Sequence, residues 1–151
     1  MKINIFSIEK LQNDNFLPII QNYKKLIEKY SKVNEKLLFN KKIVAAQKQN
    51  EGIAKKSYSE LFEPHLGRYN IFLHPEGKEL DSFEFSTVFE KNSEVNFFIA
   101  GAYGFEEEFL KKAHLKISLS KLTFGHKIAK VVLFEQIYRS FTILNNHPYH
   151  K

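Results

Sequence analysis

The chain has 151 residues and a net charge of +6, and it contains no cysteine. This length suits one domain with a real core, so we expect a single domain over residues 1–151. The lack of cysteine excludes a disulfide scaffold, a thiolate zinc site and a cysteine nucleophile. No apolar run approaches the roughly 20 residues of a membrane helix, and the N-terminus lacks a signal-peptide pattern. These features predict a cytoplasmic protein that does not contact a membrane.

The charges are distributed unevenly along the chain. Residues 1–60 carry 12 lysines against six acids, residues 61–110 carry three basic residues against ten acids, and residues 111–151 carry eight basic residues against one acid. A basic C-terminal third favours binding to a polyanion such as RNA, and a solvated lysine face without a partner is the alternative. Only Arg68 and Arg139 are arginines, and an arginine in so lysine-rich a chain suits a place that needs a rigid fork of donors.

The first 62 residues are predicted to alternate between strands and helices. Lys2–Ile8 has the apolar pattern of a strand, and Asn13–Tyr30 has apolar residues at the spacing of three and four that is typical of a helix. Asp14 suits the N-cap of that helix. Lys36–Phe39 is predicted as a short strand, and Ala45–Phe62 as a polar helix that Gly52 weakens.

The middle of the chain continues this alternation. Tyr69–Leu73 is predicted as a buried strand followed by a turn over His74–Lys78. A helix then covers Ser82–Lys91, with Ser82 as its cap. Val95–Ala100 is a second buried strand, and Glu106–Ala113 is a short acidic helix. Strands separated by helices indicate an α/β domain with a mainly parallel sheet, whose buried C-terminal strands lie at its centre.

The C-terminal segment contains a strand over Leu115–Leu119 and a strongly apolar helix over Lys127–Leu144. This helix is apolar on more than one face, which is typical of a helix that is buried nearly all round. In a domain of this size the second face favours contact with a partner subunit and hence a homodimer. A central helix in a monomer is the alternative.

Three loops follow the predicted C-terminal strands, over Leu73–Lys78, Ala100–Gly104 and Leu119–His126. In open α/β sheets, ligands bind at loops that leave the carboxyl ends of strands. Gly101 and Gly104 allow a tight turn whose amides can approach a ligand, although this spacing alone is most often only a turn. The sequence contains neither a dinucleotide fingerprint nor a phosphate loop.

The polar tail Asn145–Lys151 combines aromatic rings with a terminal lysine. Such groups stack on bases and neutralise phosphate, so the tail is a candidate RNA contact, and a frayed terminus is the alternative. His147 and His150 have the spacing of a metal pair, but without cysteine or a nearby acid we expect no metal.

Four segments together resemble the RlmH group of SPOUT methyltransferases. They are Phe97–Gly104, Ile117–His126, Val131–Arg139 and His147–Lys151. The resemblance covers the whole chain in length and element order, and it is specific from about Phe97 onward. It implies a SPOUT-type α/β domain with a C-terminal deep trefoil knot, which no periodicity would predict. It further implies a homodimer that transfers a methyl group from S-adenosylmethionine to N3 of pseudouridine 1915 in 23S rRNA of the assembled ribosome.

Side-chain chemistry suggests roles in this methyl transfer for individual residues, and the resemblance implies the cofactor residues. Arg139 would grip a phosphate, Tyr149 and His150 would hold the base, and the N3 proton would pass to His150, to His126 or to water. The implied cofactor residues are Leu73, Ala100, Gly101, Leu119, Ser120, Lys121, Leu122, Thr123 and Phe124.

Three positions depart from the family's pattern. Ala100 replaces a usual glycine, Gly125 replaces a frequent proline, and His74 stands where an acid commonly follows the first-loop leucine. Two rival interpretations remain open. One is a non-catalytic RNA-binding module on the same fold, and the other is a different small α/β enzyme, such as a flavodoxin-like protein.

Overall fold

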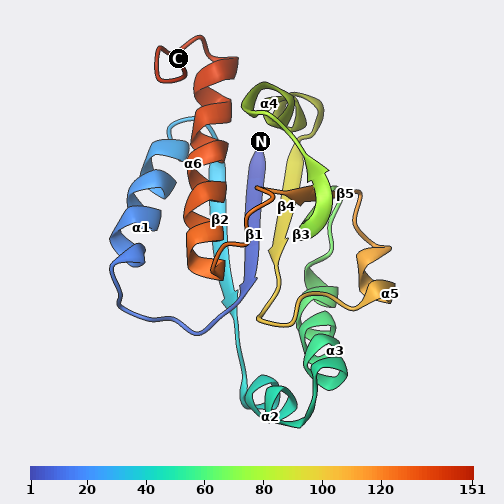
Figure 1. Cartoon of the computed structure of the whole chain (residues 1–151). Coiled ribbons are helices and arrows are strands. Elements are labelled where there is room, and N and C mark those ends of the chain that lie inside the picture. The colour runs from blue at the N-terminus through green and yellow to red at the C-terminus, as the bar shows by residue number, and fades with distance from the viewer.

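Five parallel strands form the central sheet (Figure 1). The computed structural model describes residues 1–151. The strands lie in the order β2-β1-β4-β3-β5, and every neighbouring pair is parallel. The predicted α/β fold is therefore confirmed, and β4 is central as its buried pattern predicted. The strands are β1 (Lys2–Ile8), β2 (Lys32–Leu38), β3 (Asn70–Glu79), β4 (Glu94–Ile99) and β5 (Leu115–Ser118).

Helices cover both faces of this sheet. The side chains of β4 alternate between two cores: Phe97 packs with residues of α1, α4 and α6, whereas Phe98 packs with residues of α3 and α5. Both faces of the central strand are thus removed from water, as parallel sheets require. No helix is both long enough and apolar enough to cross a membrane. The helices are α1 (Phe16–Ile27), α2 (Lys41–Gln49), α3 (Glu51–Phe62), α4 (Ser82–Lys91), α5 (Glu107–Leu110) and α6 (His126–Leu144), with a 3-10 turn over Glu63–His65.

The single helix predicted over Ala45–Phe62 is wrong, because the chain breaks into α2 and α3 at Asn50. The backbone of Asn50 is extended, with φ −163° and ψ 170°, and its side chain accepts a hydrogen bond from the Ile53 amide at 2.8 Å. One asparagine therefore ends α2 and caps α3. Asparagine favours this geometry because its short side chain competes for backbone amides.

The turn predicted over His74–Lys78 is an irregularity inside β3. Leu73 and Lys78 both pair with Ile117, so the four residues between them leave the ladder before the strand resumes. A Cβ on Gly77 would lie 2.6 Å from the carbonyl carbon of Ile117. The close approach of β3 and β5 therefore requires glycine here.

One of the two predicted helix caps is confirmed and the other is wrong. Asp14 accepts hydrogen bonds from the amides of Phe16 and Leu17 at 2.9 and 3.2 Å, as predicted for the start of α1. The cap of α4 is Asp81 rather than Ser82, in a reciprocal capping box with Glu84.

Candidate functional site

The three candidate ligand segments belong to adjacent strands: two are the loops after β4 and β5, and the third, Leu73–Lys78, is the irregularity inside β3. β3 lies between β4 and β5, with Phe72 opposite Phe98 and Leu73 opposite Ile117. Because the strands are parallel, their carboxyl ends share an edge. The structure thus brings the starts of the three segments together there.

The loop after β4 is held tightly against α3. A Cβ on Gly101 would lie 2.5 Å from Cζ of Tyr58 and 2.6 Å from its hydroxyl oxygen. Tyr58 is fully buried and donates a hydrogen bond to Gln47 at 2.5 Å. Gly104 has a φ of +79°, and its amide donates to the Gly101 carbonyl at 3.1 Å. The pair of glycines thus makes a tight turn, and Gly101 is additionally required by the phenol ring.

The loop after β5 presents its middle to solvent. The Ser118 hydroxyl donates to the Ser120 carbonyl, and the Ser120 hydroxyl accepts from the Leu122 amide at 3.0 Å. Lys121 and Thr123 are exposed, and Leu122 is 74% exposed. An ordered turn that holds a leucine in water offers apolar surface that a bound ligand can cover. Gly125 has open space around it, so no contact explains its glycine.

His74, which follows Leu73, is half-buried, and its Nδ1 accepts a hydrogen bond from the Glu76 amide at 3.1 Å. Burial lowers the pKa of His74, Glu76 opposes this shift, and Lys116 and Lys55 add to it, so that the pKa is lowered overall. The position where an acid is common in the family therefore carries a neutral imidazole at pH 7.

Arg139, Tyr149 and His150, the predicted catalytic residues, meet around one carboxylate, that of Glu135. Arg139 donates to Glu135 through Nε at 3.0 Å and Nη2 at 2.5 Å, and the Tyr149 hydroxyl donates to the same oxygen at 3.0 Å. Nη1 of Arg139 lies 3.1 Å from Nδ1 of His150. The sequence reasoning missed Glu135, although its spacing of four from Arg139 on a helix is the signal that would have found it.

The tail is packed against α6. The Tyr149 ring lies 4.8 Å from the Tyr138 ring and 4.7 Å from the Arg139 guanidinium carbon. His150 meets the edge of Phe83 at 4.7 Å. Burial and the hydrogen bond to Glu135 raise the pKa of Tyr149 well above its ordinary value, so the phenol is neutral. Because the rings of Tyr149 and His150 are packed against other side chains, the tail is not a frayed terminus.

The tail cluster and the three loops lie at opposite ends of the sheet (Figure 1). His126 is the first residue of α6. Its Nε2 lies 3.8 Å from the carboxylate of Glu9, which directly follows β1. Arg139 lies 13 residues further on, roughly 20 Å away at 1.5 Å per residue. Tyr30, which precedes β2, stacks on Phe141. Within one chain, the cofactor residues and the catalytic residues are therefore not brought together.

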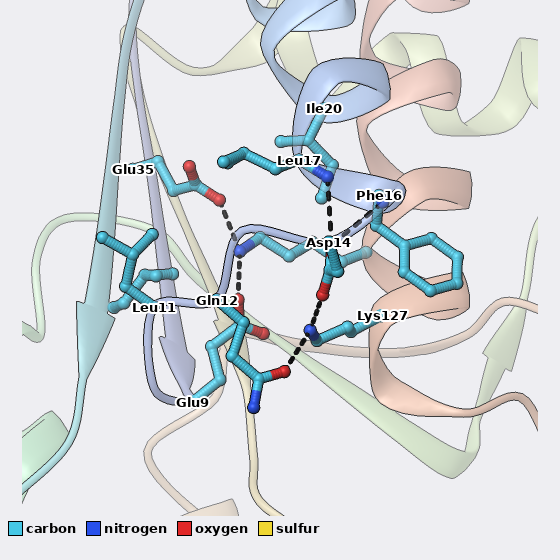
Figure 2. Close-up of a pocket in the computed structure, with 11 residues that line it drawn as sticks. Glu9, Leu11, Gln12, Asp14, Phe16, Leu17, Ile20, Glu35 and Lys127 are labelled. Carbon is cyan, nitrogen blue, oxygen red and sulfur yellow. Dashed lines mark hydrogen bonds and ion pairs between the residues drawn. The ribbon is translucent and has the colours of Figure 1, made fainter.

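A small cavity of about 40 Å³ lies between the end of β1 and the starts of α1 and α6 (Figure 2). The Lys130 side chain, only 3% exposed, is 2.8 Å from Glu9 and 2.5 Å from Glu35. Lys127 pairs with Asp14 beside it. These ion pairs occupy the space between the elements and anchor the first turn of α6 to β1 and β2. The anchored turn fixes the end of the loop that follows β5.

The structure holds no group of three histidine, aspartate or glutamate side chains arranged to bind a metal. In the tail, Nδ1 of His147 accepts a hydrogen bond from the Tyr149 amide, and Nδ1 of His150 contacts Arg139. Each imidazole therefore already uses one of its two nitrogens within the chain.

Several known proteins are similar to this chain over its whole length. A family described as predicted SPOUT methyltransferase matches residues 1–150. A ribosomal RNA large subunit methyltransferase H from Aliarcobacter butzleri is 52% identical, and one from Campylobacter concisus is 47% identical, each over all of both chains. The solved structure of a probable methylase family protein from Haemophilus influenzae superposes with a TM-score of 0.57 at 15% identity, covering 99% of this chain and 70% of that one. At 15% identity, this similarity shows a shared fold and nothing about activity.

Proposed function

Because this chain belongs to the SPOUT methyltransferase family, we propose that it transfers a methyl group from S-adenosylmethionine to N3 of pseudouridine 1915 in 23S rRNA of the assembled ribosome. The observation that carries the proposal is the full-length identity of about half to enzymes named as large-subunit rRNA methyltransferases. A protein that modifies ribosomes works in the cytoplasm.

The residues at the sheet edge fit the proposed cofactor. S-adenosylmethionine supplies an activated methyl group on a sulfonium. The adenine needs an apolar slot with backbone donors, and the loops offer Leu73, Leu119, Phe124 and the exposed Leu122. Ala100 and Gly101 bring backbone amides to the same edge, where the tight turn limits side-chain bulk. Ser120, Lys121 and Thr123 complete the proposed cofactor residues within the loop after β5.

A homodimer would complete the site. A second copy can present its tail to the loops of the first, whereas the tail of the same chain lies at the far end of α6. The helix α6 also keeps apolar surface uncovered: Ile128 is 43% exposed, and Val131 and Val132 are half-buried. This surface supports an isologous interface that uses α6.

In this proposal Arg139 neutralises an RNA phosphate, while Tyr149 and His150 hold the target base. Tyr149 is held neutral and acts as a hydrogen-bonding ring rather than as a base. A guanidinium only donates, so Nδ1 of His150 accepts from Arg139 and Nε2 carries the hydrogen. His150 then has no lone pair for the N3 proton. His126, 52% exposed at the loop edge, or water is left to receive that proton.

The two rival interpretations make different predictions. In the flavodoxin-like order the third strand neighbours the first, whereas here β4 does, so that fold is excluded. A pure RNA-binding module does not need the three-loop site. Calorimetric titration with S-adenosylmethionine tests this alternative, combined with transfer of a labelled methyl group to ribosomes that lack the modification. Binding and transfer are expected, and an absence of binding at millimolar ligand would refute the methyltransferase proposal.

A further inference from the structure

The segment from the end of β2 through α3, residues 36–62, carries dense positive charge; we call it the α2–α3 arm. The arm contains six lysines and two acids, Glu51 and Glu60. Lys42 pairs with Glu60, and Lys55 pairs with Glu51. The other four lysines, which are exposed and form no ion pair within the chain, are Lys36, Lys41, Lys48 and Lys56.

The arm has a shape that suits a nucleic-acid strand. Lys41 and Lys48 are seven residues apart on α2, so they lie on the same face of the helix. A hollow of about 330 Å³ lies between α2 and α3, lined by Lys42 and Lys56 and by the apolar Ile53. Ile53 is 39% exposed. The lysines can contact the phosphates of a nucleic-acid strand, and the partly apolar hollow beside them can contact its sugars or unstacked bases.

The arm is also fixed to the proposed cofactor site. Tyr58 of α3 packs against Gly101 and donates its hydroxyl hydrogen to Gln47 of α2. The Ser59 hydroxyl donates to Glu106, just after the same loop, at 2.5 Å. The arm projects beyond the carboxyl edge of the sheet (Figure 1). A strand bound along it would pass beside the three loops rather than at the far end of the molecule.

We propose that the α2–α3 arm binds the phosphate backbone of ribosomal RNA next to the methyl-donor loops. The proposal rests on the proposed function and adds a docking surface for its substrate. The occupant is RNA because the arm is a positive surface at the edge where the modified base must arrive. Contacts from the arm would add to those of the tail in holding so large a substrate.

A charge-neutralising pair tests the arm. The double variant Lys41→Gln/Lys48→Gln removes two unpaired charges and leaves the ion pairs and the core intact. The matched control is Lys25→Gln/Lys91→Gln, which removes two exposed, unpaired lysines from the last turns of α1 and α4. For each protein, the dissociation constant for assembled ribosomes is measured against salt concentration, together with affinity for S-adenosylmethionine.

The arm variant is expected to bind ribosomes about tenfold more weakly and to reduce the salt slope by about 2, one for each lost phosphate contact. Its affinity for S-adenosylmethionine should match the wild type, and the control should bind like the wild type. Equal weakening in both variants would overturn the proposal, because only total charge would then matter. Weaker binding with an unchanged salt slope would indicate a protein partner and overturn it as well. If the wild-type protein bound ribosomes but not S-adenosylmethionine, the methyltransferase proposal would be refuted instead. The ribosome affinities of the arm variant and the control would still test the arm.

Discussion

Arg139 and His150 meet at 3.1 Å through Nη1 and Nδ1, although 11 residues separate them along the chain. The contact joins the last helix to the tail, and Glu135 holds the other side of the guanidinium. Because arginine has five donors in a planar fork, it can bind the carboxylate and the imidazole at once and still offer a donor to phosphate.

Arg139→Lys should therefore impair methylation while keeping the charge. Lysine reaches one partner as a point charge, so the geometry of Glu135 and His150 around it is lost. Losing charge-assisted hydrogen bonds worth about 1–3 kcal/mol should lower kcat/KM by roughly 10- to 100-fold. Affinity for S-adenosylmethionine should not change, since the three loops lie at the other end of α6. Full activity in the lysine variant would show that only charge matters at this position.

Gly101→Ala should disrupt the proposed cofactor edge. The added methyl would lie 2.5 Å from the Tyr58 ring, which is fully buried and hydrogen-bonded to Gln47. Overpacking of this kind costs about 1–3 kcal/mol of unfolding free energy, and the displaced loop should bind S-adenosylmethionine more weakly.

Gly125→Ala is the matched control, because open space surrounds that glycine. Chemical denaturation and calorimetry on both variants measure the two effects. If the two alanine variants were equally stable and bound the cofactor equally well, the Tyr58 contact would have no importance.

The sequence predicted most of the architecture because its cores are strongly patterned. Val95–Ala100 is apolar apart from Asn96, and it coincides closely with the central strand β4 (Glu94–Ile99). The predictions failed where one residue overrides the pattern. Asn50 splits a helix by capping with its side chain, which periodicity does not detect. In the sequence, His74-Pro75-Glu76-Gly77 resembles a turn that ends a strand. In the structure, Gly77 instead lets β3 resume its pairing with β5 after an irregularity.

The roles of the candidate site residues stay a prediction, but the structure shows how these residues are arranged. Arg139, Tyr149 and His150 lie together, roughly 20 Å along α6 from His126. Sequence spacing cannot show this separation, because it depends on the direction in which α6 crosses the sheet. The trefoil knot stays a prediction, since threading of the chain leaves no trace in periodicity.

We predict a homodimer in which α6 contributes to the interface. Ile128→Glu places a charge on the exposed apolar side of α6 and should shift the protein toward monomers, because burying an unpaired carboxylate is costly. Methylation should fall with dimer content if the partner supplies the tail.

Light scattering at micromolar concentration measures this equilibrium. Val44→Glu is the control, since Val44 is 37% exposed on α2, away from α6, and this variant should remain dimeric. A wild-type protein that is monomeric under these conditions would contradict the prediction.

The assembled ribosome should be a far better substrate than an isolated rRNA fragment. The positive charge of these 151 residues is divided between the N-terminal 60 residues and the C-terminal third. A short hairpin cannot reach both regions, whereas a large particle can. Initial rates of methyl transfer to both substrates, at matched concentration and salt, measure the difference. Equal rates would mean that local RNA structure is sufficient for recognition.

Removal of Tyr149–Lys151 should abolish methylation and leave the affinity for S-adenosylmethionine nearly intact. The deletion takes away two rings that can stack on an exposed base, each worth about 1–3 kcal/mol, together with a lysine that can neutralise phosphate. The proposed cofactor residues lie upstream and at the opposite edge of the sheet, so they should be unaffected. Calorimetry with S-adenosylmethionine and methyl transfer to ribosomes are measured on the same truncated protein.

The truncation also uncovers Tyr138, which packs on Tyr149 and is otherwise buried, so a milder variant is needed beside it. His150→Ala removes only the imidazole at Arg139 and Phe83 and leaves Tyr149 bound to Glu135. It should reduce methylation without a change in melting temperature, which separates a loss of RNA contact from a loss of stability. Full activity of the truncated protein would mean that the tail contributes nothing to methylation. Affinity for S-adenosylmethionine that fell together with activity would place the tail of one chain in the cofactor pocket, contrary to the distance along α6.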